Sequence, residues 1–209
     1  QRRAALVVQD YALTLRVLQV ANSFHYNRSN KPIDNIARAI IIMGVCELRS
    51  LASSLVIFHE FDKRSDALKR LMLLSMLTAI HASGTAGAEG VKRQEEAYLL
   101  GMFRNLGEVL VACHWPDIYA RISDDEPGTV PGSNAVRVLG FSYETLARVV
   151  GEHWNLPSQI MALWSKTIGT ADLMSAIAQF GHDVTNVMYR RPSGDVWTKL
   201  RLLRMQHGR

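Results

Sequence analysis

The chain of 209 residues is 48% hydrophobic and 21% charged, the composition of an ordinary soluble protein with one large domain or a domain plus an appendage. No apolar run approaches the roughly 20 residues of a membrane span, and the first residues do not form a signal peptide, so we expect a cytoplasmic protein. Cys46 and Cys113 lie far apart, which argues against a disulfide framework and favours a reducing compartment.

The formal net charge is +5, and all of this excess lies at the C-terminal end. Residues 190–209 contain six Lys or Arg and one acid, Asp195, and six minus one gives +5. A nucleic-acid-binding surface usually carries its basic residues on a reading element within the fold. A basic terminal helix is more often a solvated face or a linker, so nucleic-acid binding through this tail ranks third among the functions considered.

Helical periodicity dominates the chain, and no segment alternates convincingly as a strand does. We expect a first helix over residues 6–21, followed by a polar loop that ends at Pro32. Asp34 is the predicted N-cap of a second helix, which Gly44 ends because glycine adopts a left-handed backbone at little cost. A third helix is predicted over residues 47–59.

The fourth predicted helix spans residues 66–82, and three glycines within residues 83–90 predict an exposed loop. Two helices should follow, over residues 94–100 and 106–121. Pro116 must kink or split the second of them, because proline cannot donate a hydrogen bond in the middle of a helix.

Acids, prolines and glycines concentrate at residues 123–133 and predict a second exposed loop. Ser142 is the predicted N-cap of a helix that runs to Trp154, and Ser158 that of the next one. The last predicted helices span residues 173–189 and 196–205. The sequence therefore predicts an all-α fold of about ten helices with two exposed loops.

Two sequence blocks near the N-terminus resemble a known family. Residues 13–23 read LTLRVLQVANS, and residues 32–55 read PIDNIARAIIIMGVCELRSLASSL. In their order of features these blocks resemble the HDOD domain, a helical relative of the HD phosphohydrolases found in bacterial signalling proteins. Residues 98–122 and 139–164 look like the central and closing helices of that family. The positions that match its motifs are Asn22, Ser23, Pro32, Gly44, Arg49, Gly107, Trp154 and Pro157.

The resemblance covers roughly residues 8–164 and implies an HDOD-like helical domain over residues 1–170, with its N-terminal lead-in missing. Residues 171–209 are then additional helices with a basic tail, packed on the domain or serving as a linker. The same motif residues also explain the fold by themselves. Asn22 and Ser23 can satisfy backbone groups left open at a helix end, and Arg38 and Arg49 suit solvated positions or local ion pairs.

Catalysis by an HD hydrolase depends on a first histidine, an adjacent His-Asp pair and a later aspartate, which together hold metal ions. In this resemblance the His-Asp pair falls on Arg104 and Asn105, the first histidine near Leu74, and a further histidine of related two-metal enzymes on Tyr143. Arginine cannot ligate a divalent cation, and leucine offers no ligand atom. We therefore predict no catalytic residue, no metal and no cofactor, and a vestigial pocket formed by Leu74, Arg104, Asn105 and Tyr143.

Other candidates for chemistry are weaker. His182 and Asp183 form a literal His-Asp dipeptide, but they lie beyond the motifs and receive little weight. No histidine pair has HxxxH spacing, and no GxxxxGK[ST] or GxGxxG run is present, so a phosphate-cradling loop is unsupported.

The leading hypothesis is a non-catalytic bacterial signalling module that acts through a protein partner or senses a small ligand. The pocket would bind an anionic small molecule or nothing. The C-terminal helix is a candidate partner surface through Trp197, Leu200, Arg201 and Arg204, and packing of this helix against the domain is the equal alternative. The competing hypothesis is a metal-dependent phosphohydrolase with atypical ligands.

Overall fold

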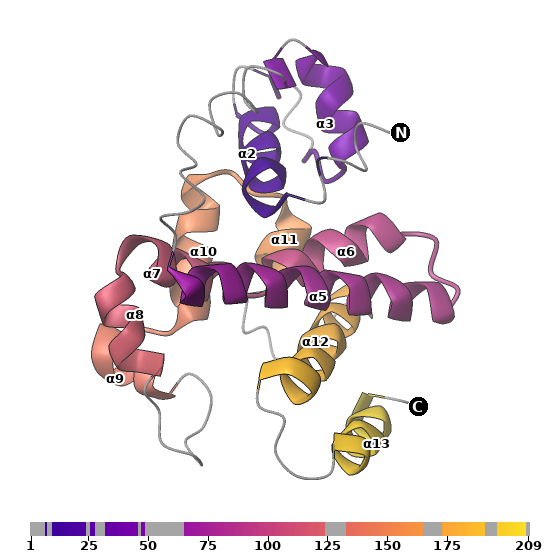
Figure 1. Ribbon diagram of the computed structural model, residues 1–209. Coiled ribbons are helices and arrows are strands. Elements are labelled where there is room, and N and C mark those ends of the chain that lie inside the picture. Colours follow the sequence, from indigo (N-terminus) through magenta and orange to yellow (C-terminus); the bar gives the residue numbers. More distant parts are fainter. Residues whose placement is uncertain are drawn as a thin grey trace.

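The computed structural model describes residues 7, 10–23, 26–27, 32–45, 47–48, 65–123, 133–164, 173–190 and 196–207. Every regular element in these ranges is helical, so the all-α prediction is confirmed (Figure 1). The elements are α2 (Tyr11–Ala21), α3 (Ile36–Met43), α5 (Asp66–Ala88), α6 (Gln94–Phe103), α7 (Leu106–His114), α8 (Pro116–Ser123), α9 (Ser133–Leu139), α10 (Tyr143–His153), α11 (Ser158–Ala162), α12 (Leu173–Thr185), the π-helical turn η2 (Asn186–Arg190) and α13 (Val196–His207). Arg49 and most of the predicted helix over residues 47–59 lie outside the described residues.

Helix α5 lies across the middle of the molecule, and α6 and α12 pack along it (Figure 1). Two glycines allow this close approach. A Cβ on Gly101 of α6 would lie 2.8 Å from the carbonyl oxygen of Thr78, and one on Gly181 of α12 would lie 2.8 Å from the backbone nitrogen of Ala82. Because the neighbouring atoms belong to the α5 backbone, both helices need a residue without a side chain at these points.

The predicted loop over residues 83–90 is wrong, because α5 continues to Ala88. Ala82 and Ala86 are fully buried, and the Thr85 hydroxyl donates to the carbonyl oxygen of His81 at 2.8 Å. A glycine inside a helix costs about 1 kcal/mol relative to alanine, and burial of this alanine face offsets that cost. The chain leaves the helix at Gly90, whose φ is +70°.

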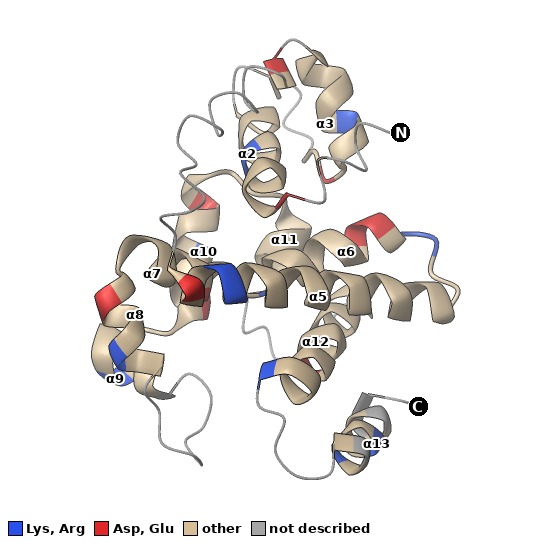
Figure 2. Cartoon of the chain, in the orientation of Figure 1, with Lys and Arg blue, Asp and Glu red and all other residues tan. Residues whose placement is uncertain are grey.

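The charged residues of α5 gather at its N-terminal end, where Asp66, Lys69 and Arg70 lie, and the rest of the helix carries none (Figure 2). Within the described part of the chain, α5 is the one helix long and apolar enough to cross a bilayer by length and composition. Helices α6 and α12 cover part of that apolar surface, and Leu73 and Ile80 remain exposed on it.

The N-terminal helices are fixed to this centre by aromatic and polar contacts. The rings of Tyr11 in α2 and Phe103 in α6 meet edge to face, with their centroids 5.5 Å apart. The N-cap of α3 is Asn35 and not Asp34 as predicted, since the Asn35 side chain accepts a hydrogen bond from the amide of Arg38. Asp34 instead accepts a hydrogen bond from the Gln159 side chain at 3.3 Å.

Several helix ends agree with the sequence analysis. Pro116 splits its predicted helix: α7 ends at His114 and α8 begins at Pro116. At the first position of a helix the amide has no acceptor within the helix, so the missing N–H of proline costs no hydrogen bond. Ser142 caps α10 through a hydrogen bond from the amide of Thr145. Ser158 does not cap α11, because it is the first residue of the helix and Pro157 occupies the N-cap position. Helix α9 was not predicted, since residues 123–133 and the short segment after them carry few helical signals.

His81 of α5 connects the central helix to the C-terminal part of the chain. Its ring stacks on Tyr189 of η2, with centroids 6.2 Å apart, and its buried Nε2 has no hydrogen-bond partner among the described residues. Burial lowers the pKa of His81 below its ordinary value, because the environment disfavours the charged ring.

This lowered pKa predicts a pH-dependent contribution of His81 to stability. Above the ordinary histidine pKa of about 6.5, the contribution of His81 to the free energy of unfolding is complete. As the pH falls below this value, the unfolded chain binds a proton more readily than the folded chain, so this contribution is lost. Urea unfolding at pH 7.5 and pH 5.5 should show a smaller loss of stability on acidification in His81→Phe than in the unmodified chain. Equal losses in the two proteins would show that His81 does not titrate in this window.

Candidate functional site

A cavity of about 820 Å³ lies between α5, the α6–α7 turn, α10 and the C-terminal elements η2 and α13. Leu74, Arg104, Asn105 and Tyr143, the four residues predicted to form a pocket, all line it. They come from three separate parts of the chain, and the fold brings them to one place. Whether this cavity has a binding function stays a prediction.

Buried neighbours hold the polar turn between α6 and α7 in place. Phe103 ends α6 and Leu106 begins α7, and both side chains are fully buried. The two residues between them, Arg104 and Asn105, are therefore carried to the cavity wall by the packing on either side. Gly107 follows them with its Cα against the backbone of Tyr143, the first residue of α10.

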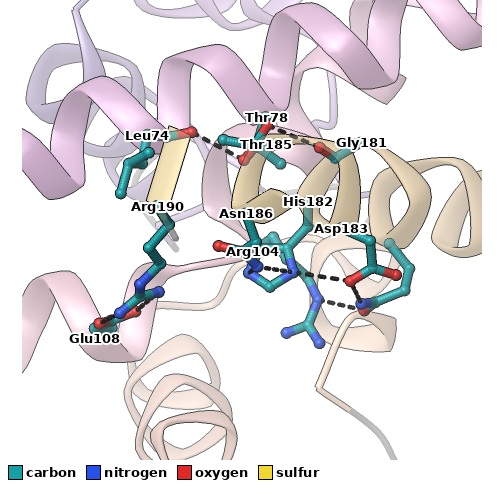
Figure 3. Close-up of polar contacts among 11 residues, drawn as sticks. Leu74, Thr78, Arg104, Glu108, Gly181, His182, Asp183, Thr185, Asn186 and Arg190 are labelled. Atoms are coloured by element: carbon teal, nitrogen blue, oxygen red, sulfur yellow. Dashed lines mark hydrogen bonds and ion pairs between the residues drawn. The ribbon is translucent and has the colours of Figure 1, made fainter. Parts of the chain in front are cut away.

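Arg104 is held by a relay of hydrogen bonds from α12, drawn in Figure 3. Its Nε donates to Gln179 Oε1 at 2.9 Å, and Gln179 Nε2 donates to Asp183 Oδ1 at 2.9 Å. Burial lowers the pKa of Arg104, and the carboxylates of Glu144 and Asp183 act in the opposite direction. The side chain still carries its charge, because an arginine in a protein does not lose its proton near neutral pH.

A buried ion pair joins the C-terminal part of the chain to α7. Both terminal nitrogens of Arg190 in η2 donate to the carboxylate of Glu108, and the Tyr119 hydroxyl donates to Glu108 Oε1 at 2.9 Å. Burial would lower the pKa of Arg190, but the charge of Glu108 and its hydrogen bonds outweigh burial and raise it. Burial, followed by the Glu108 charge, raises the pKa of Tyr119 to about 12, so its hydroxyl keeps its proton.

His182 and Asn186 complete the wall on the side of α12 and η2. The Asn186 amide lies 3.1 Å from His182 Nε2, and His182 Nδ1 lies 3.5 Å from Asp183 Oδ1. The π-helical turn that begins at Asn186 changes the direction of the following side chains, and such turns often occur at functional sites. His182, Asn186 and Arg190 all line the cavity.

Sequence reasoning missed this side of the cavity. The His182–Asp183 dipeptide was given little weight, yet His182 lies at the cavity wall. One local signal for the ion pair was available. Glu108 interrupts the apolar run LGEVLVA, and a carboxylate in a buried helix needs a partner.

The model of the HDOD domain family matches residues 1–167. This chain belongs to the HDOD family. Among solved structures it is similar to the MmoQ response regulator of Methylococcus capsulatus, with 19% identity, a TM-score of 0.72, and coverage of 95% of this chain and 82% of that one. It is also similar to an HDOD domain protein of unknown function from Geobacter sulfurreducens, with 21% identity, a TM-score of 0.55, and coverage of 96% and 75%. At these identities the likeness establishes the fold. The search of curated proteins found no relative.

Asn22 and Ser23, two of the positions matched to HDOD motifs, form hydrogen bonds with backbone groups at the end of α2. Asn22 Nδ2 donates to the carbonyl oxygens of Leu18 and Ile33, and its Oδ1 accepts from the amide of Ile33, each at 2.9 Å. These bonds tie the end of α2 to the segment that begins at Pro32. Ser23 Oγ donates to the carbonyl oxygen of Val20 at 2.7 Å.

The remaining HDOD motif positions in the described part of the chain also lie at helix ends. Gly44 ends α3 with a φ of +85°, the half-buried Trp154 follows α10, and the buried Pro157 precedes α11. None of these three residues lines the cavity. Gly107 is the motif position that does.

The predicted partner surface lies on α13, which packs against α12 and η2. Leu200 is half-buried and Arg201 is exposed, whereas the side chains of Trp197 and Arg204 lie outside the described part of the structure. The exposed apolar side chains described on this helix are Leu202 and Met205. Lys199, on the same helix, lines the cavity.

Proposed function

We propose that this HDOD chain is a non-catalytic, cytoplasmic module of bacterial signal transduction, which acts through a protein partner or by sensing a small ligand. Membership of the HDOD family and the likeness to a response regulator support a regulatory role. The observation that carries the non-catalytic part is the composition of the cavity. Leu74, Arg104, Asn105 and Tyr143 occupy the positions where the resemblance to HD hydrolases expects metal ligands, and all four line the cavity.

The charge of Arg104 opposes metal binding in this cavity. A guanidinium offers no lone pair to a metal ion and repels a divalent cation at short range. Glu108, a buried carboxylate at the wall, is already engaged by Arg190 and Tyr119. Binding a metal through Glu108 would therefore require breaking a buried ion pair, which is costly because Arg190 would lose its counter-ion.

The competing function, a metal-dependent phosphohydrolase with atypical ligands, would use His182 at the cavity wall. The metal content of the purified chain separates the two functions. We expect elemental mass spectrometry, without added metal or chelator, to find far less than one equivalent of iron, manganese or zinc. Thermal unfolding should also be unchanged by added Mn²⁺, because a ligand that does not bind the folded state cannot stabilise it.

One equivalent or more of a transition metal, together with a phosphatase activity that a chelator removes, would contradict the non-catalytic proposal. Arg104→His and Asn105→Asp, introduced together, provide a comparison, because they restore a His-Asp pair at the cavity wall. If the unmodified chain binds one equivalent of metal and this double variant binds no more, Arg104 and Asn105 do not prevent metal binding and the proposal is wrong.

A further inference from the structure

Arg104 is a half-buried cation with open hydrogen-bond donors at the cavity wall. Its guanidinium has five N–H groups, and the one on Nε is used by Gln179. The terminal nitrogens have no hydrogen-bond or ion-pair partner among the residues that the structure describes. The terminal nitrogens are not among the buried atoms without a partner, so they are accessible from the cavity and free to bond a ligand or water there.

The surroundings of Arg104 orient its guanidinium and leave its terminal nitrogens open to the cavity. The relay of Gln179 and Asp183 fixes the plane of the guanidinium, and Figure 3 shows its terminal nitrogens directed away from α12. The carboxylates of Glu144 and Asp183 lie near enough to favour its charged form. A fork of parallel N–H donors held in this way fits a carboxylate or a phosphate group.

The other walls define the rest of the occupant. Leu71, Leu74, Ile122 and Val187 give the cavity apolar surface, and a volume of about 820 Å³ is that of a site for a metabolite-sized molecule. Glu108, the buried acid, is neutralised by Arg190. Asp66, Glu144, Arg70 and Lys199 also line the cavity, and their charges balance, so it suits a molecule whose anionic group lies at Arg104 and whose body is apolar.

The cavity also depends on the C-terminal elements. His182, Asn186, Val187 and Arg190 line it from α12 and η2, and Lys199 lines it from α13. These residues lie beyond residue 167, where the match to the HDOD family model ends. A molecule bound at Arg104 would contact the family domain and this C-terminal segment together.

We infer that the cavity binds a small organic carboxylate or phosphate ester, whose anionic group pairs with Arg104, and that the bound molecule stabilises the docking of α12, η2 and α13 on the domain. This inference names a ligand class for the sensing role proposed above and rests on that role. Its test measures binding and not metal content, so the two proposals can fail separately.

The first test is thermal unfolding of the chain with phenyl phosphate, benzoate or inorganic phosphate, against sodium chloride at equal ionic strength. Phenyl phosphate or benzoate should raise the midpoint by about 3 °C or more, and the stronger of the two identifies the anionic group. Arg104→Met should abolish this response while its own midpoint stays equal or rises, because the variant removes a charge that the fold partly desolvates.

Arg148→Met is the matched control, since Arg148 is half-exposed in an i,i+4 pair with Glu152 and does not line the cavity, and this variant should keep the full response. If Arg104→Met fails to fold, Arg104→Lys is tested in its place. Lysine keeps the positive charge but lacks the parallel N–H donors of the guanidinium, so the probe should bind to this variant about tenfold more weakly. The inference is overturned if neither organic probe acts beyond the salt control, or if inorganic phosphate alone does. Equal responses of Arg104→Met and the unmodified chain would overturn it too.

Hydrogen exchange tests the coupling to the C-terminal segment. Amides within residues 173–190 and 196–207 should exchange several-fold more slowly with the effective probe bound, and should not do so in Arg104→Met. Protection confined to residues 66–123 would show that the C-terminal segment does not respond to the bound molecule.

Discussion

Gly107→Ala is expected to lower the free energy of unfolding by about 3 kcal/mol or more. A Cβ at this position would meet the carbonyl oxygen of Tyr143 in direct overlap and would lie 2.7 Å from its carbonyl carbon. Both atoms belong to the backbone, so no change of rotamer relieves the contact, and α10 must move away from α7. Urea unfolding followed by circular dichroism measures the loss.

Gly84→Ala is the matched control for this experiment. Gly84 lies within α5, and an added Cβ there has nothing within 4 Å. Alanine is a better helix former than glycine, so this variant should gain about 0.5–1 kcal/mol. If Gly107→Ala stays within about 1 kcal/mol of the unmodified chain, the close contact between α7 and α10 is not a feature of the folded protein.

Arg190→Met should destabilise the chain by about 3 kcal/mol, because it leaves the Glu108 carboxylate buried without its cation. The Glu108 side chain is only 8% exposed, and Tyr119 alone remains to bond it. Glu108→Gln should cost less, since the Arg190 side chain is 31% exposed and water can reach it. Chemical denaturation of the two single variants and the double variant measures the coupling.

The double variant Glu108→Gln/Arg190→Met should be more stable than the sum of the single effects predicts, because it no longer buries an unpaired charge. Arg148→Met controls for the loss of an arginine as such, and its half-exposed pair with Glu152 should contribute less than about 1 kcal/mol. Additive single effects would mean that Arg190 does not hold η2 to α7.

Local signals in the sequence determined the positions of most helices. The period of apolar residues, the break at Pro116, the cap at Ser142 and the positive φ of Gly44 all act within about one helical turn. They can therefore be recognised without knowing the tertiary fold. The limit of such signals shows at α3, where Asn35 and not its neighbour Asp34 caps the helix.

The grouping of Leu74, Arg104, Asn105 and Tyr143 was also predicted from the sequence, but only through the resemblance to the HDOD family. Periodicity places each of these residues on a helix or turn and gives no distance between them. The structure brings all four to one cavity. The family resemblance therefore predicted which residues form the site, and local sequence patterns did not.

Tertiary structure alone decided the extension of α5 and the C-terminal wall of the cavity. Three glycines near residue 87 predict a loop, but burial of Ala82 and Ala86 keeps the segment helical to Ala88. Glu108 and Arg190 are 82 residues apart, and their pairing exists only because α12 packs on α5 and turns at η2. Burial and ion pairing depend on which surfaces meet in space, and no local pattern specifies that.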